Sequence, residues 1–264
     1  MLNISSLRDI GSALLKIVPK YRFASNSREA LRTGAAGDST FPFDKACEDI
    51  ILSMLDDSKE PLSIISEENG YSEINGGGRR VIIDPLDGSR NATTGIPFFC
   101  TSIAAADGDT IGDINLCYII NLISGDEFWA EKDSGAFLNE GRIFTSKSEK
   151  IEVVLYETHN TTKDMQRLLP LFKQSHRIRC FGTIAMDLSY LSMGAASIAI
   201  NPSKSRTFDF GGGWLLVKEA GGIFTDTNGS DISKVKLGLG HETNYIASAN
   251  ITIHQKALEL LNKI

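Results

Sequence analysis

One stretch of the chain, Ile82–Phe99, restricts the possible folds and functions more than any other. It continues the β-branched run Val81–Ile83, which predicts a short strand. Pro85 fixes its own φ and has no N–H to donate, so the strand is expected to stop there. Asp84 and Asp87 would then leave the edge of the sheet on a tight turn. The stretch therefore predicts two carboxylates that project from the end of a strand.

The next two residues, Gly88 and Ser89, add a second chemical feature. Glycine allows a sharp change of direction, after which both amides can open a helical turn with unpaired N–H groups. Carboxylates suit a hard cation such as Mg²⁺, and free amides at the start of a helix suit a phosphate. The alternative is an ordinary surface turn, because Asp, Pro and Gly are common turn formers.

Two further acidic sites favour the functional interpretation. Upstream, the β-rich run Ser63–Ser66 ends in Glu67 and Glu68. Adjacent residues at a strand end point to opposite faces, so only one of the two acids is expected to reach a shared metal site. Downstream, Asp209 stands at the head of a predicted helix that contains three glycines. Three acidic sites in this order are far more specific than any single motif.

This set of motifs resembles the inositol monophosphatase superfamily, and the similarity covers nearly the whole chain. The segment Gly37–Lys45 looks most like the archaeal branch, whose members often hydrolyse both inositol phosphates and fructose-1,6-bisphosphate. The resemblance implies a metal-dependent, lithium-sensitive phosphatase of small phosphate esters. It also implies an α+β fold, a layered αβαβα sandwich of the inositol monophosphatase/fructose-bisphosphatase type.

The same resemblance implies a metal centre of two or three Mg²⁺ ions, with Mn²⁺ as a possible substitute. Three ligand groups are expected: Glu67, Asp84 and the Leu86 carbonyl; Asp84, Asp87 and Asp209; and, for a weaker third ion, Glu67 and Asp44. Oxygen-only ligands favour Mg²⁺ over zinc. The nucleophile would be a metal-activated water oriented by Glu67 and the Ser89 hydroxyl, while Glu68 serves in supporting hydrogen bonds.

Substrate contacts follow from the resemblance in two groups. The phosphate would be held by Asp87 and by the amides of Gly88 and Ser89. The sugar side would involve Gly182 and Thr183 at a strand-to-helix junction, together with Arg179, Asn201, Lys204 and Arg206. For Arg179 the alternative is a plain surface arginine, whereas Arg206 matches an arginine of the archaeal relatives.

An acid expected for sharp recognition of the ring is missing from its usual position. Archaeal relatives that act on fructose bisphosphate tend to carry it at the end of the strand before the late aspartate, where this chain has Ile200. Isoleucine accepts no hydrogen bond, so ring recognition is expected to be loose. Fructose-1,6-bisphosphate and inositol-1-phosphate should both be hydrolysed, with Arg206 or Lys204 favouring the bisphosphate.

The polar stretch Ser25–Thr40 has two interpretations. It is long for a connector, which is typical of either a mobile surface loop or a functional lid. The resemblance favours a lid and gives Thr40 a catalytic role. Asp44 follows at the start of a helix, where an acid also suits the helix dipole. The match to the family favours a catalytic, metal-holding role for Asp44.

The rest of the chain divides into two halves of different rhythm. Residues 1–146 carry an amphipathic helix over Ser5–Tyr21, the acidic motifs, a connector over Tyr71–Arg80 and a meander of antiparallel strands. Residues 147–264 alternate strands and helices as α/β units do. We expect one compact fold with the site at the junction of the halves. His254 is placed on the polar face of the last helix.

Composition limits the partners. A net charge of −6 argues against a general nucleic-acid binder, and no apolar run is long enough to span a bilayer. The start lacks a secretory signal, and the four cysteines read as reduced and buried, so a cytoplasmic protein is expected. The expected partners are a small-molecule phosphate ester and a second copy in a homodimer, with no nucleic acid and no membrane.

Three other functions remain as alternatives. The first is a 3′-phosphoadenosine 5′-phosphate phosphatase of the same superfamily, which would show more basic and aromatic residues around its pocket. The second is a non-catalytic sugar-phosphate sensor. The third is a purely structural protein, for which so many inward carboxylates would be unexplained.

Overall fold

The computed structural model describes residues 2–21 and 29–262. The first of the helices runs from Ile4 to Tyr21, one residue longer at its start than the expected Ser5–Tyr21. In the described residues they are α1 (Ile4–Tyr21), α2 (Pro42–Asp57), α3 (Ser89–Thr94), α4 (Thr161–Gln174), α5 (Ile184–Ser192), α6 (Thr207–Glu219) and α7 (Ile251–Leu261), with one 3₁₀ turn, η1 (Ile111–Asp113). None of the described helices is long and apolar enough to cross a membrane.

The larger sheet comes from the first part of the chain and has the order β10-β9-β8-β7-β6-β5-β3-β4. Its neighbours are antiparallel except for the parallel pair β3 and β5. Its strands are β3 (Leu62–Ser66), β4 (Gly70–Ile74), β5 (Arg79–Asp87), β6 (Cys100–Ala106), β7 (Ile114–Asn121), β8 (Glu127–Glu131), β9 (Gly135–Leu138) and β10 (Gly141–Ile143).

The smaller sheet has the order β12-β11-β13-β15-β14. The first three strands are mutually parallel, and β15 runs antiparallel to β13 and β14. Its strands are β11 (Val153–Tyr156), β12 (Arg177–Arg179), β13 (Ile198–Arg206), β14 (Ile223–Thr225) and β15 (Glu242–Ser248). A separate hairpin joins β1 (Arg32–Thr33) to β2 (Ser39–Thr40).

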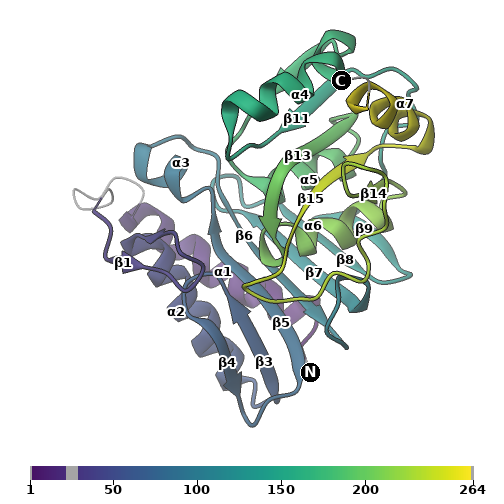
Figure 1. Ribbon diagram of the computed structural model, residues 1–264. Helices are drawn as coiled ribbons and strands as arrows, with labels where there is room; N and C mark the ends of the chain where they lie inside the picture. The colour runs from purple at the N-terminus through teal and green to yellow at the C-terminus, as the bar shows by residue number, and fades with distance from the viewer. Residues whose placement is uncertain (1, 22–28, 263–264) are drawn as a thin grey trace.

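The elements stack in five layers (Figure 1), which confirms the predicted αβαβα sandwich. Helices α1 and α2 pack on the outer face of the larger sheet. Helices α5 and α6 contact both sheets and lie between them. Helices α4 and α7 cover the outer face of the smaller sheet. The central helical layer therefore joins the two sheets in one core, and it carries Asp209 to their junction.

The three glycines of α6 explain how this helix fits between the sheets. A Cβ on Gly211 would approach Ile82 Cδ1 to 2.6 Å, and one on Gly213 would approach Leu188 Cβ to 2.6 Å. Real Cβ atoms do not tolerate such distances, so only glycine allows α6 to pack against both β5 and α5. The price in helix propensity, about 1 kcal/mol for each glycine relative to alanine, is offset by the surrounding burial.

Two expectations about local structure are wrong, and a third falls partly outside the described residues. The expected connector Tyr71–Arg80 contains most of β4, which pairs antiparallel with β3, and the start of β5. Strand β13 continues past Pro202 to Arg206, because a register shift between Asn201 and Ser205 means that the proline ring interrupts no regular ladder. Part of the expected lid, residues 25–28, lies outside the described residues; residues 29–40 contain the β1–β2 hairpin.

Two side chains also differ from expectation. His254 is buried (3 % exposed), with Nδ1 3.0 Å from the Ser248 hydroxyl and Nε2 3.0 Å from the Thr225 hydroxyl. Burial lowers the pKa of His254 to about 4, so the ring is a neutral part of the core beneath α7. Cys180 is exposed, whereas Cys47, Cys100 and Cys117 are buried as expected.

Candidate active site

The central motif leaves the sheet through a bulge, so the expectation that Pro85 ends its strand is wrong. Strand β5 continues to Asp87, and its register against β6 shifts between Asp84 and Asp87. The shift removes the need for a donor at Pro85, whose carbonyl accepts a hydrogen bond from the Thr101 hydroxyl at 2.7 Å. The bulge re-aims the chain, and both aspartates line the same cleft.

The turn after β5 requires glycine. Gly88 has φ +92°, in the left-handed region, and immediately precedes α3. A Cβ at this position would approach Thr183 Cγ2 to 2.8 Å. The close approach brings the first turn of α3 against the Gly182–Thr183 turn of the other half of the chain. The amides of Gly88 and Ser89 thus belong to a short turn on the cleft wall.

Four carboxylates from three elements meet in this cleft. Glu67 follows β3, Asp84 lies within β5 and Asp87 ends it, and Asp209 lies in the first turn of α6. Burial, together with the charge of Asp209, raises the pKa of Glu67 to about 8 and that of Asp87 to about 8. Burial, followed by the charges of Glu67, Asp87 and Asp209, raises the pKa of Asp84 well above its usual range. The cluster carries more negative charge than its surroundings neutralise.

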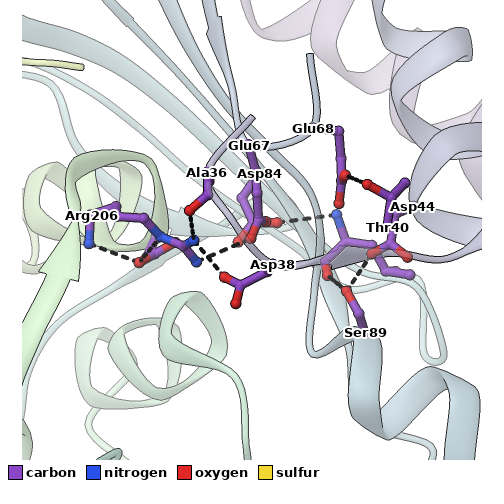
Figure 2. Close-up of polar contacts among 11 residues, drawn as sticks. Ala36, Asp38, Thr40, Asp44, Glu67, Glu68, Asp84, Ser89 and Arg206 are labelled. Carbon is purple, nitrogen blue, oxygen red and sulfur yellow. Dashed lines mark hydrogen bonds and ion pairs between the residues drawn. The ribbon is translucent and has the colours of Figure 1, made fainter. Parts of the chain in front are cut away.

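Arg206 is the counter-charge that holds part of this cluster together (Figure 2). Its Nη2 lies 3.0 Å from Glu67 Oε1, its Nε lies 3.4 Å from Asp209 Oδ2, and its Nη1 lies 2.5 Å from Asp38 Oδ2. The side chain is 18 % exposed. Arg206 therefore bonds two expected metal ligands rather than standing free on the sugar side.

The β1–β2 hairpin packs against the same cluster. The amides of Ala35 and Ala36 donate to the carbonyls of Glu68 and Glu67 at 3.0 and 3.1 Å. Thr40 is fully buried, and its hydroxyl donates to Glu68 Oε2. Thr40 does not line the cleft. Asp38, in the hairpin turn, does line the cleft. The described part of the expected lid thus lies over the end of β3 (Figure 2).

Asp44 lies behind the cleft wall and acts on Ser89 (Figure 2). Its Oδ2 accepts the Phe41 N–H at 2.9 Å, and its Oδ1 contacts the Ser89 hydroxyl. The hydroxyl also lies 2.7 Å from the Leu86 carbonyl. Burial raises the pKa of Asp44 to about 7. Asp44 therefore caps α2 with one oxygen and contacts the Ser89 hydroxyl with the other, while its metal-holding role stays a prediction.

Helix α5 fixes Asp87 from the second half of the chain. The Ala185 N–H, in the first turn of α5, donates to Asp87 Oδ2 at 2.6 Å. The Gly182–Thr183 turn just before this helix lines the cleft, as expected from the resemblance. The Thr183 hydroxyl is buried and has no hydrogen-bond partner among the described residues.

Three expected sugar-side residues lie outside the cleft lining, whereas Arg206 is part of it. Arg179 is exposed on the edge strand β12, and Lys204 is exposed on β13. Asn201 is buried and donates to the Ser205 hydroxyl at 2.8 Å, while it accepts from the Ser203 N–H. The side chain of Ile200 is buried in the core beneath α4 and α7.

Sequence reasoning missed Glu157 and His159, which both line the cleft. Glu157 follows β11 directly, in the way that Glu67 follows β3, and His159 lies two residues further on. A carboxylate immediately after a β-branched run is therefore the signal that could have found Glu157.

The donor set fits a hard divalent cation. All its side-chain donors are oxygens, and their raised pKa values indicate that added positive charge would be favourable. Among the described residues, no three acidic, His or Cys side chains are already grouped around a common point, and Arg206 pairs with two of the acids, Glu67 and Asp209. Glu67, Asp84, Asp87, Asp209 and the Leu86 carbonyl are the groups that would hold Mg²⁺.

Comparison with known proteins decides the family. The model of the inositol monophosphatase family matches residues 4–264. The chain belongs to this family. It is therefore a phosphatase of the inositol monophosphatase/fructose-1,6-bisphosphatase type, and this family is generally metal-dependent.

Named relatives agree with this assignment and show its breadth. A fructose-1,6-bisphosphatase/inositol-1-monophosphatase of Methanothermobacter thermautotrophicus is 30 % identical, over 89 % of this chain and 88 % of the relative. A bifunctional NADP phosphatase/NAD kinase of Methanococcus maripaludis is 29 % identical over 87 % of this chain and 44 % of its own length. A solved inositol monophosphatase-fructose 1,6 bisphosphatase has a TM-score of 0.85 at 26 % identity and covers 98 % of this chain and 100 % of its own.

Proposed function

We propose that this phosphatase is Mg²⁺-dependent and hydrolyses small sugar and inositol phosphate monoesters, fructose-1,6-bisphosphate and inositol-1-phosphate among them. The observation that carries the proposal is the position of four carboxylates beside the Gly88–Ser89 turn in one cleft. The cluster suits the cation and the amides suit the phosphate. The name of the Methanothermobacter relative supports the choice of substrates.

Each residue has a definite task in this proposal. The amides of Gly88 and Ser89 hold phosphate oxygens, and the Ser89 hydroxyl, anchored by Leu86 and Asp44, orients the attacking water. Glu67 Oε1 pairs with Arg206, so Oε2 is the oxygen that would accept the proton of that water. Bound Mg²⁺ would offset the charge of the phosphoryl group and make the water more acidic.

The size of the cleft favours small esters over nucleotides. Its volume is about 250 Å³, below the ≈ 300–1,000 Å³ of pockets that enclose drug-sized ligands. A nucleotide would leave its base outside. The NADP phosphatase relative keeps nucleotide hydrolysis as the second candidate function.

A panel of esters tests the proposal. We expect phosphate release from fructose-1,6-bisphosphate and inositol-1-phosphate in the presence of Mg²⁺, with kcat/KM values within about a hundredfold of each other, near 2.7 kcal/mol. 3′-Phosphoadenosine 5′-phosphate and NADP should react more slowly. Faster phosphate release from either nucleotide would favour nucleotide hydrolysis as the function. No release from any ester would favour the non-catalytic sugar-phosphate sensor.

The metal requirement tests the role of Asp44. We expect millimolar Mg²⁺ to activate and Li⁺ to inhibit. Asp44→Ala should raise the half-saturating Mg²⁺ concentration by about tenfold, near 1.4 kcal/mol, and lower the maximal rate less. The reason is that Asp44 reaches the site only through Ser89 or an outlying ion. Asp49→Ala, an exposed acid on the same helix paired with Lys45, is the matched control. A Mg²⁺ titration of Asp44→Ala that overlays the wild-type curve would contradict this role.

A further inference from the structure

Glu157 occupies a defined place in the cleft wall. It is the first residue after β11, and its N–H donates to the Ile200 carbonyl at 3.1 Å. Strand β11 lies between β12 and β13, which run parallel to it. Glu157 therefore projects from the carboxyl end of a central parallel strand, the position at which open α/β sheets bind ligands. The side chain next to the buried Ile200 is thus an acid, supplied by the neighbouring strand.

The carboxylate of Glu157 is anchored on one side. The Gly182 N–H donates to Oε1 at 2.7 Å, and the Cys180 thiol lies 3.7 Å from the same oxygen. The Phe181 N–H also donates to this carboxylate. A carboxylate has about four lone-pair sites, so these three donors leave it able to accept from a ligand. Within the described part of the chain, no Lys, Arg or His forms an ion pair with Glu157. The Glu157 carboxylate is therefore available to bind a ligand rather than held in a structural salt bridge.

The charge of Glu157 determines which part of a ligand it can face. A carboxylate repels phosphate, so Glu157 must face the uncharged part of an ester whose phosphate lies at the Gly88–Ser89 turn. Hydroxyl groups are the uncharged donors that a carboxylate binds most strongly. The Gly182 turn links the two regions, because Gly182 anchors Glu157 while Thr183 packs against Gly88. The buried, unpartnered hydroxyl of Thr183 adds a second polar group on this side.

We propose that Glu157 is a specificity-determining residue that accepts hydrogen bonds from neighbouring hydroxyls on the leaving group of the substrate. This inference rests on the proposed function and narrows it to esters of polyols and sugars. Inositol and fructose both offer adjacent hydroxyls, so both meet the requirement. Ring recognition is therefore carried by β11 rather than by the end of β13.

The test compares two esters that differ only in their hydroxyls, inositol-1-phosphate and cyclohexyl phosphate. The quantity measured is the ratio of their kcat/KM values with Mg²⁺. We expect Glu157→Gln to reduce this ratio about thirtyfold, mainly through the KM for inositol-1-phosphate. The amide keeps an oxygen for the Gly182 N–H, so the turn should stay intact. Glu152→Gln, an exposed acid just before β11, removes the same charge outside the cleft and should leave the ratio at its wild-type value.

The outcomes separate this inference from the proposed function. A ratio within threefold of wild type in Glu157→Gln, with turnover intact, would overturn the role of Glu157 and leave the phosphatase proposal standing. If the wild type releases no phosphate from any ester, the proposed function fails. Calorimetric titration with the same two esters then still tests Glu157, because the preference in binding affinity should fall in Glu157→Gln and not in Glu152→Gln. Equal preferences in both variants would overturn the inference.

Discussion

Asp87→Asn and Asp209→Asn are each expected to reduce phosphate release by more than a thousandfold while the protein stays folded. Each change removes a negative charge from the cluster that would hold Mg²⁺, and it keeps the size of the side chain. The hydrogen bonds that orient the residues also survive, because an asparagine oxygen can accept the Ala185 N–H in place of Asp87 and the Arg206 N–H in place of Asp209. A loss of activity without a loss of fold is therefore the expected result.

Stability without metal provides the second half of this experiment. The folded-state pKa of Asp87, about 8, lies above its ordinary value of 3.8, so ionisation of Asp87 destabilises the metal-free protein as pH rises between about 4 and 8. Asp87→Asn removes that penalty. The metal-free variant should thus be at least as stable as the wild type at pH 8, with a smaller difference at pH 5.

Phosphate release and the thermal midpoint are measured together, with Asp57→Asn, an exposed acid at the end of α2, as the control. Activity within about tenfold of wild type, a loss below roughly 1.4 kcal/mol, would remove the residue concerned from the metal site.

The residues that sequence reasoning identified share one property: their positions follow from local pattern. Glu67 follows a strand, while Asp44 and Asp209 each lie three residues after a helix N-cap and accept its N–H. Such positions are specified by a few neighbouring residues. The five-layer fold was expected from the resemblance to the inositol monophosphatase superfamily, while periodicity predicted individual elements such as α1.

What sequence reasoning missed depends on contacts between distant segments. Glu157 belongs to the site only because β11 pairs with β13 and the Gly182 turn folds over it. Pro85 does not end its strand because the pairing register shifts beside it, and a register shift depends on the partner strand. His254 looks polar in sequence, but Ser248 and Thr225 satisfy its ring in the core.

Arg206 shows this difference most clearly, because its motif was recognised but its contacts were not. The bond to Asp209 is local, whereas Glu67 and Asp38 lie 139 and 168 residues away in sequence. The guanidinium supplies positive charge to carboxylates that a divalent cation would otherwise neutralise. Arg206 and Mg²⁺ should therefore neutralise the same carboxylates. The stabilisation that each one provides should then depend on whether the other is present.

Arg206→Gln is accordingly expected to lower the free energy of unfolding of the metal-free protein by about 3 kcal/mol at pH 8, because it leaves partly buried carboxylates without their counter-charge. Without the guanidinium the pKa of Glu67, already raised to about 8, rises further. The additional destabilisation grows as pH rises through the folded-state pKa, so the deficit should be smaller at pH 5 than at pH 8.

Saturating Mg²⁺ should restore most of this loss, so the stabilisation by Mg²⁺ becomes larger in Arg206→Gln than in the wild type. Denaturant unfolding with and without Mg²⁺ measures both quantities. Arg8→Gln is the matched control: Arg8 pairs with Glu127 and Glu140 far from the cleft, so its loss should be within about 1 kcal/mol and independent of Mg²⁺. A deficit for Arg206→Gln as small as that of the control, or one that Mg²⁺ leaves unchanged, would show that Arg206 does not neutralise the metal-binding carboxylates.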